Sequence, residues 1–387
     1  MEIKVIASTC PDYQLPVEEA KFFAGHSAGI CYMKDDLGAI QREPEERTMA
    51  RFQQTAGSGH HSVAGHTSYN LLLTGIPKII AMVLNNEKDY NTSEKSARYT
   101  QMTLSGEEEW LYSKWLNLFQ EAIKAVYPQL DEKVRLKLAQ ENARYFISVF
   151  TPSTIMEYTV DFRQGNYLIG FLEEFAERSC CEYEPFFQKL REPLLETAKL
   201  FRQVLNCEEI RDRKGRSLSL FATRERSEYF GEVYSVNYKG SFAQLAQAHR
   251  HRSINYEMIV PDWQNAEFFV PPIIRGTSWE HEYLKDMQKV VQNYPQGMLV
   301  KINERGIPED LVTSKCSERL CGVAQLEICL QTQRTLERYI SNTVNNGEAE
   351  VFKYLYPIQG LTKCRFTKQV CERGCPLGWA HAFDRKI

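Results

Sequence analysis

The sequence predicts an α/β protein in which helices dominate. Residues 107–126 and 131–149 have apolar side chains at helical spacing, as in Trp110, Trp115 and Leu118, and this spacing is typical of a helix with one buried face. Residues 69–73 have the composition of a strand. A chain of 387 residues with 43% hydrophobic content is a globular protein with room for two domains.

The first half of the chain gives clear boundaries for these elements. After the strand at 69–73, Gly75-Ile76-Pro77 ends it, and a helix is expected to begin at residues 78–84. The acidic residues Glu107, Glu108 and Glu109 stand where a helix dipole favours negative charge. Another helix is expected at residues 184–206.

A charged stretch divides the sequence. Residues 207–217 contain the basic run from Arg211 to Arg216 and are expected to form a solvated linker, although a surface loop inside one domain has the same composition. The predicted organisation is therefore a first repeat at 1–206, a linker at 207–217 and a second repeat at 218–387. Glu177-Arg178-Ser179-Cys180 resembles Glu318-Arg319-Leu320-Cys321, each expected at the start of a long helix.

Composition excludes several classes of protein. A net charge of -3 and a pI near 6.3 argue against binding to nucleic acid or to a membrane, because both need a basic face. The first residues do not have the apolar run of a signal peptide, and we expect a cytoplasmic enzyme. The 11 cysteines are expected to be reduced thiols in that compartment.

Two short motifs carry the predicted chemistry. Arg250-His251-Arg252 offers two planar guanidinium groups and one titratable ring, with the arginines expected on one side of an extended segment. The motif Ser96-Ala97-Arg98-Tyr99 joins a hydroxyl to a guanidinium, and the pair suits the oxygens of a phosphate. Each motif alone is more often a solvated surface patch.

Together the two motifs resemble the signature of flavin-dependent thymidylate synthases, in which Arg-His-Arg is followed shortly by Ser-x-Arg-Tyr. In this chain Asn86-Glu87-Lys88 stands where the Arg-His-Arg triplet of the upstream copy belongs. Val260-Pro261-Asp262 stands where the Ser-x-Arg of the downstream copy belongs. The resemblance implies a fused tandem repeat whose copies have lost complementary halves, each with a small mixed or antiparallel sheet and long helices.

Further segments extend the resemblance over much of the chain. The segments that resemble family motifs are residues 60–66, with Gly65 in place of a glutamate; Ala143-Arg144; residues 159–163, with Asp161 in place of an asparagine; residues 171–178; Gln247; and residues 319–328. Because these segments occur in the family's order and spacing, they support both predicted copies.

The resemblance implies roles for individual side chains on the substrate. Ser96 and Arg98 would bind the nucleotide phosphate, and Arg144 and Gln247 would bind the pyrimidine. Arg178 would polarise the ring as the catalytic residue, with Arg319 as the alternative. The residues implied for the flavin are His60, Ser62, Arg163, Arg250, His251 and Arg252. A metal among His60, His61 and His66 is not expected, because no carboxylate or cysteine completes a ligand spacing.

The implied reaction is the reductive methylation of dUMP to dTMP, with methylenetetrahydrofolate as carbon donor, FAD as carrier and NADPH as reductant. The alternatives are the same chemistry on another pyrimidine nucleotide, or a non-catalytic descendant that binds nucleotide or flavin. Because the family's active sites form between subunits of a homotetramer, the fused chain is expected to form a homodimer that rebuilds a pseudo-tetramer.

The C-terminal tail contains Cys364, Cys371 and Cys375. With Cys321 they have the number of ligands of a structural zinc site. From the sequence, reduced thiols in a loop are favoured over such a site.

Overall fold

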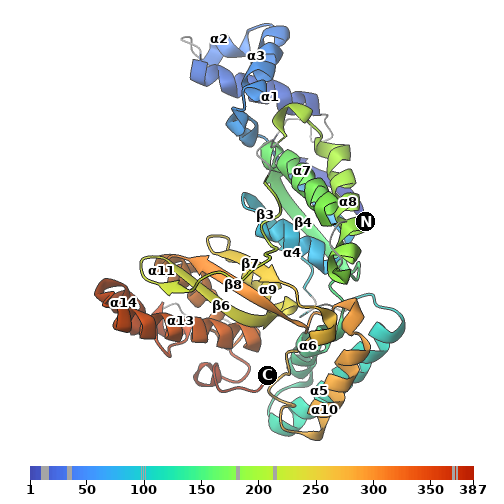
Figure 1. Ribbon diagram of the computed structural model, residues 1–387, viewed down its shortest axis with the longest axis vertical. Helices are drawn as coiled ribbons and strands as arrows, with labels where there is room; N and C mark the ends of the chain where they lie inside the picture. Colours follow the sequence, from blue (N-terminus) through green and yellow to red (C-terminus); the bar gives the residue numbers. More distant parts are fainter. Residues whose placement is uncertain are drawn as a thin grey trace. The chain divides into compact units, whose positions relative to one another are not determined.

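The structure is a computed structural model that describes residues 1–9, 17–32, 37–96, 98, 100, 102–179, 184–211, 216–367, 371 and 374–387. Its chain divides into two units (Figure 1). Unit 1 comprises Met1–Lys95 and Pro152–Leu218, and unit 2 comprises Ser96–Thr151 and Ser219–Ile387. The stretch Ser96–Thr151, which the sequence assigned to the first repeat, is therefore part of unit 2. Residues 212–215 of the expected linker lie outside the described residues.

Unit 1 is built on an antiparallel sheet of β1, β2, β4 and β3, in that order. Its strands are β1 (Glu2–Ser8), β2 (Ser68–Ile76), β3 (Tyr90–Glu94) and β4 (Thr154–Asp161), and its helices are α1 (Val17–Tyr32), α2 (Leu37–Gln41), α3 (Glu45–Gly57), α4 (Lys78–Asn86), α7 (Phe162–Ser179) and α8 (Pro185–Leu205). The predicted strand at 69–73 and the helix starting at 78 are confirmed by β2 and α4.

One face of this sheet forms the core of unit 1. Leu71 and Leu73 of β2 and Tyr158 of β4 are fully buried, and they alternate with more exposed neighbours because side chains of a strand point to opposite faces. Helices α4, α7 and α8 pack on this face. Helices α1 and α3 pack against each other at Gly25, whose missing side chain leaves room for the Thr48 backbone.

Unit 2 contains a second antiparallel sheet, with the order β5, β6, β8 and β7. Its strands are β5 (Tyr229–Phe230), β6 (Tyr234–Ser241), β7 (Asn255–Ile259) and β8 (Leu299–Gly306), and its helices are α5 (Gly106–Val126), α6 (Glu132–Ala143), α9 (Phe242–Ala248), α10 (Ser278–Lys289), α11 (Pro308–Asp310), α12 (Ser317–Arg319), α13 (Leu326–Asn346), α14 (Ala349–Leu355) and α15 (Lys363–Phe366). A π-helical turn, Leu311–Cys316, joins α11 to α12.

Two apolar clusters stabilise unit 2. Under the sheet, Val236 of β6 packs with Leu336 and Tyr339 of α13, and Figure 1 shows α13 alongside β6. The second cluster joins α5 to α10, where the Trp115 ring stacks on Phe146 at 5.6 Å and meets the edge of Tyr283 at 5.0 Å. Burial of such large rings provides much of the hydrophobic stabilisation of a domain.

The predicted fold class is confirmed: the protein is mixed α/β with two antiparallel sheets and long helices. Numbered along the chain, the four strands of each sheet have the same order, first, second, fourth and third. In both units a helix follows the second strand, as α4 in unit 1 and α9 in unit 2.

Three local predictions were wrong. The helix expected at 131–149 ends at Ala143, because the Arg144 side chain takes the Glu141 carbonyl and a 3₁₀ turn, Arg144–Phe146, follows. Arg178 lies in the last turn of α7 rather than at the start of a helix. Residues 250–252 form turns after α9 rather than an extended segment, because Arg250 N and His251 N donate to the carbonyls of Gln247 and Ala248.

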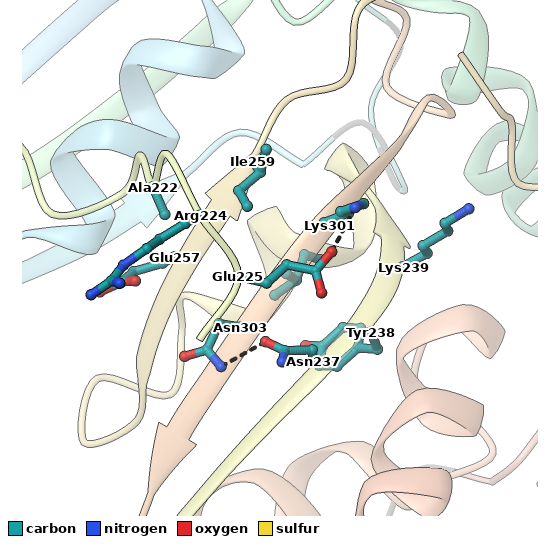
Figure 2. A pocket seen from close by; sticks show the side chains of 11 residues that line it. Ala222, Arg224, Glu225, Asn237, Tyr238, Lys239, Glu257, Ile259, Lys301 and Asn303 are labelled. Carbon is teal, nitrogen blue, oxygen red and sulfur yellow. Dashed lines mark hydrogen bonds and ion pairs between the residues drawn. The ribbon is translucent and has the colours of Figure 1, made fainter. Parts of the chain in front are cut away.

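The outer face of the second sheet has a small polar pocket of about 200 Å³ (Figure 2). Its charged side chains pair with neighbours: Lys301 Nζ lies 2.5 Å from Glu225 Oε1, and Glu257 accepts from Arg226. None of the predicted site residues lines it. Among the helices of the described residues, none is both long and apolar enough to cross a membrane.

Candidate functional site

Arg98 is held in unit 2 by a carboxylate and a backbone carbonyl. Its backbone N–H donates to Ser96 Oγ at 3.3 Å, so the serine hydroxyl caps the turn that carries it. The guanidinium pairs through Nε with Glu141 and donates through Nη2 to the Val323 carbonyl at 2.9 Å. The side chain is 14% exposed. Tyr99 lies outside the described residues.

Arg144 lies one turn after Glu141 and is buried. Its Nε donates to the Glu141 carbonyl at 3.2 Å, and its Nη2 donates to Gln325 Oε1 at 2.8 Å. Glu141 therefore organises two arginines, Arg98 through its carboxylate and Arg144 through its backbone. Burial lowers the pKa of Arg144, and the charge of Arg98 acts in the same direction.

Gln325, just before α13, is the hub of a buried amide network. Its Oε1 accepts from Arg144 and from Gln247 Nε2, and its Nε2 donates to the Tyr145 hydroxyl at 2.5 Å. Tyr145 in turn donates to Glu327 Oε2 at 3.0 Å. This network orients the Gln247 amide, because its nitrogen donates to Gln325 Oε1.

The oxygen of the Gln247 amide, unlike its nitrogen, does not take part in this network. This oxygen, Oε1, is buried and has no hydrogen-bond partner among the described residues. A buried acceptor without a partner costs about 1–3 kcal/mol, and such a group needs an explanation in a native protein. A bound donor, such as the N–H of a ligand, would satisfy it.

His251 is buried, at 2% exposure. Arg319 Nε donates to His251 Nε2 at 2.8 Å, so this ring nitrogen is unprotonated, and Nδ1 donates its proton to Ser314 Oγ at 3.1 Å. Burial, and then the charges of Arg319 and Lys315, lower the pKa of His251 to about 2. The ring is therefore neutral at physiological pH and acts as an acceptor for a cation.

The π-helical turn that carries Ser314 also carries a buried ion pair. Lys315 and Glu304 are both completely buried and bind each other. Tyr234 and Tyr238 each donate to the Glu304 carboxylate at 2.9 Å. Because a buried ion pair is stable only when its remaining hydrogen bonds are satisfied, these tyrosines hold the turn that positions His251.

Positive charge accumulates in this part of unit 2. Burial lowers the pKa of Arg319, and the charges of Arg98 and Arg250 add to that effect. We call Arg98, Arg144, Arg250 and Arg319 the arginine cluster. Planar guanidinium groups that repel one another at close range make a site for an anion, and they match phosphate oxygens with two parallel donors.

The structure brings together part of the predicted site. The predicted residues in unit 2 are Ser96, Arg98, Arg144, Gln247, Arg250, His251 and Arg252, together with the alternative catalytic residue Arg319. Arg252 is exposed, whereas its neighbour His251 is buried.

The other predicted residues belong to unit 1: His60, Ser62, Arg163 and Arg178. His60 and Ser62 are exposed. Arg163 Nη2 lies 3.6 Å from Asp161 Oδ2, close to the position where Gly65 replaces the family's glutamate. Arg178 is 58% exposed and pairs with Glu174 one turn earlier. The functional roles of these residues remain predictions.

Sequence reasoning missed Glu141 and Ser314 as partners of the arginine cluster and of His251. A usable signal existed for Glu141, because a carboxylate three residues before Arg144 on a helix lies on the same face. No sequence signal identified Ser314.

Comparison with known protein families gives a match over part of the chain. Residues 17–173 match the family model described as Thymidylate synthase complementing protein. This match includes Ser96, Arg98 and Arg144 and ends before Gln247 and Arg250. No curated protein sequence matches the chain.

The solved structures that are similar to the chain include the following three. Two are flavin dependent thymidylate synthase ThyX from Helicobacter pylori with FAD and dUMP, at 18% and 16% identity, each with a TM-score of 0.30; they cover 53% and 54% of this chain and all of their own. The third is a UMP/dUMP methylase, PolB, from Streptomyces cacaoi with 5-Br dUMP, at 12% identity and a TM-score of 0.34, covering 52% of this chain and 90% of its own.

Proposed function

We propose that the protein is a flavin-dependent thymidylate synthase-like enzyme, on the premise that residues 17–173 match the family model described as Thymidylate synthase complementing protein. The proposed reaction is the reductive methylation of dUMP to dTMP. It takes the carbon from methylenetetrahydrofolate, uses FAD as the carrier and takes its electrons from NADPH. When bound, the reduced flavin supplies the hydride.

One observation carries this proposal: the two separated half-signatures lie in the same unit. Arg98 comes from the upstream motif and Arg250 from the downstream motif, and the charges of both lower the pKa of Arg319. Two motifs that lie about 150 residues apart in the sequence thus contribute to one positive cluster. The two halves therefore lie in one unit, although the sequence assigned them to different repeats.

The residues present fit the proposed ligands. Ser96 and Arg98 would bind the nucleotide phosphate, because a hydroxyl beside a guanidinium matches its oxygens. Gln247, whose buried Oε1 accepts no bond from the described residues, would accept an N–H of the pyrimidine, and Arg144 would hold this amide in place through Gln325. Arg250 and Arg252 would pair with the anionic flavin and its pyrophosphate.

Arg319 is favoured over Arg178 as the group that polarises the pyrimidine ring. Arg319 is half-buried, is held by His251 and belongs to the arginine cluster, whereas Arg178 is 58% exposed and already pairs with Glu174. A guanidinium in a dry environment stabilises developing negative charge more strongly than one in water. His60, Ser62 and Arg163 of unit 1 remain proposed flavin contacts on the resemblance alone.

The equal strand order of the two sheets supports an origin by tandem duplication. If each unit stands for one subunit of a family homotetramer, two copies of this chain would provide the four units. We therefore propose a homodimer in the cytoplasm that acts on a pyrimidine nucleotide.

The decisive experiment measures binding and turnover separately. Purified protein should be yellow and should form dTMP from dUMP, methylenetetrahydrofolate and NADPH. In Arg98→Ala the Kd for dUMP should rise about 10-fold to 150-fold, the effect of losing a contact of 1.5–3 kcal/mol to a charged group, while flavin content stays nearly constant. Arg252→Ala should instead reduce flavin content. The exposed Arg334→Ala in the same unit is the matched control.

The alternatives predict different results in the same experiment. Turnover with another pyrimidine nucleotide in a panel, but not with dUMP, would identify a related reaction. Binding of flavin or nucleotide without any turnover would identify a non-catalytic descendant. Neither flavin nor nucleotide bound by the wild-type protein would refute the proposal.

A further inference from the structure

The cysteines of the C-terminal tail lie next to the loop that follows α12. Lys363 N donates to the Leu320 carbonyl at 2.7 Å, which places Cys364 beside Cys321. On the other side of the loop, Cys375 Sγ lies 3.2 Å from the position that a Cβ on Gly322 would occupy. Cys321, Cys364 and Cys375 therefore come from distant parts of the sequence to one place.

The fourth cysteine of this group is Cys371, which lies between Cys364 and Cys375 in the same tail. Cys321, Cys364 and Cys375 are free thiols. We call Cys321, Cys364, Cys371 and Cys375 the cysteine cluster.

Two of these sulfur atoms have polar hydrogen-bonding neighbours. Val323 N donates to Cys321 Sγ at 3.4 Å, and the Thr362 hydroxyl lies 3.3 Å from Cys364 Sγ. Donors aimed at cysteine sulfur stabilise thiolates and are the usual outer partners of metal-bound cysteines. Four neighbouring thiolates repel one another unless a cation lies between them, which favours either four protonated thiols or a bound metal ion.

From this arrangement we propose that the cysteine cluster binds one zinc ion, which fastens the tail to the loop at 320–325. Four thiolates are a complete ligand set for structural Zn²⁺. Among the described residues no group of three His, Cys, Asp or Glu side chains is already arranged to hold a metal ion. Binding therefore requires the thiolates to close around the ion, in the way that metal binding and local folding are coupled in small zinc sites.

The zinc site would stabilise the arginine cluster. The loop at 320–325 provides the Val323 carbonyl that holds Arg98 and the Gln325 side chain that holds Arg144. Arg385 near the C-terminus also ties the tail to this loop, because its guanidinium donates to the carbonyls of Cys321 and Ala324. The proposal itself does not depend on which reaction the enzyme performs.

The first test uses the wild-type chain. After purification without chelators, elemental analysis should find about one zinc per chain, the stoichiometry of a four-thiolate site. Titration of the thiols with an organomercurial should release this zinc to a chromogenic chelator. Substitution by Co²⁺ should give the strong charge-transfer absorption of a thiolate-bound metal.

Variants then locate the site. Cys371→Ser and Cys375→Ser should each lose most of the zinc, whereas the exposed Cys31→Ser of unit 1 should retain it. Because the wild-type measurements need no variant, poor folding of a mutant cannot hide the answer. Absence of metal from the wild type together with no thiolate absorption on adding Co²⁺ would overturn the proposal. So would iron with sulfide in place of zinc, or disulfides among these cysteines.

Discussion

Arg319 Nε donates to His251 Nε2 over 2.8 Å. This contact defines the neutral tautomer of the imidazole and gives the middle residue of Arg250-His251-Arg252 a function that the sequence did not indicate. The ring supports Arg319, and its other nitrogen is anchored by Ser314. The three residues of one motif thus differ in environment, since Arg252 is exposed and His251 is buried.

The buried imidazole should make stability depend on pH. His251 has a pKa of about 2 in the folded chain and about 6.5 when unfolded. Between these values the unfolded state binds a proton that the folded state does not, so stability falls as pH decreases, by up to about 1.4 kcal/mol per pH unit from this group. Urea unfolding of wild type and His251→Gln from pH 7 to pH 4.5 should therefore show a shallower decline in the variant. Parallel curves would contradict this assignment, and the exposed His281→Gln should follow the wild type.

Arg319→Lys should separate charge from geometry. Lysine keeps the positive charge but lacks the planar fork that contacts His251 and the Gln247 carbonyl together. We expect turnover to fall at least tenfold with little change in the Kd for dUMP, because the contact is proposed to act mainly on the developing charge of the ring. Steady-state kinetics and calorimetry measure the two effects. An unchanged kcat would show that Arg319 does not act in the reaction. Arg178→Lys tests the other candidate arginine in the same way.

Removing the cation of the buried pair should destabilise unit 2 strongly. Lys315→Met leaves the Glu304 carboxylate buried without its ammonium partner, and breaking such a pair costs about 3–5 kcal/mol. Chemical unfolding monitored by circular dichroism measures the loss. The exposed Lys285→Met on α10 should change stability by no more than about 0.5 kcal/mol. Equal stabilities of the two variants would show that the pair contributes little.

Two glycine substitutions should have opposite effects in unit 1. A Cβ at Gly25 would lie 2.4 Å from the Thr48 carbonyl oxygen, so Gly25→Ala must separate α1 from α3 and should cost about 1–3 kcal/mol. Gly57, at the end of α3, has no atom within 4 Å of such a Cβ. Gly57→Ala should be neutral or stabilising by up to about 1 kcal/mol, because alanine favours helix. Thermal unfolding of both variants checks the prediction, and a stable Gly25→Ala would refute the close packing.

Light scattering tests the proposed assembly. If two copies of the chain rebuild a pseudo-tetramer, the purified protein should have the mass of a homodimer, twice 44.9 kDa. A monomer at micromolar concentration would count against a composite site completed by a second copy. A larger assembly would show that the units do not stand in for family subunits one for one.

The sequence by itself determined the fold class and several elements, and it indicated a resemblance to one enzyme family. Apolar spacing located α5, because it reports which face of a helix is buried, and composition together with the break at Gly75 and Pro77 located β2 and α4. The helix expected at 184–206 is α8. The motifs around Ser96 and Arg250 indicated this resemblance because their residue types and order are specific. These signals are local, because each depends on a short stretch of sequence.

The tertiary structure decided which residues meet. That Ser96–Thr151 belongs to unit 2 depends on packing such as the Trp115 contact with Tyr283, which no local pattern reports. The burial of His251 and its contact with Arg319 depend on a π-helical turn far along the sequence. The end of α6 at Ala143 was decided by a side chain competing for a helix carbonyl. Side-chain contacts between distant segments depend on how the segments pack, and the sequence of each segment alone does not specify that packing.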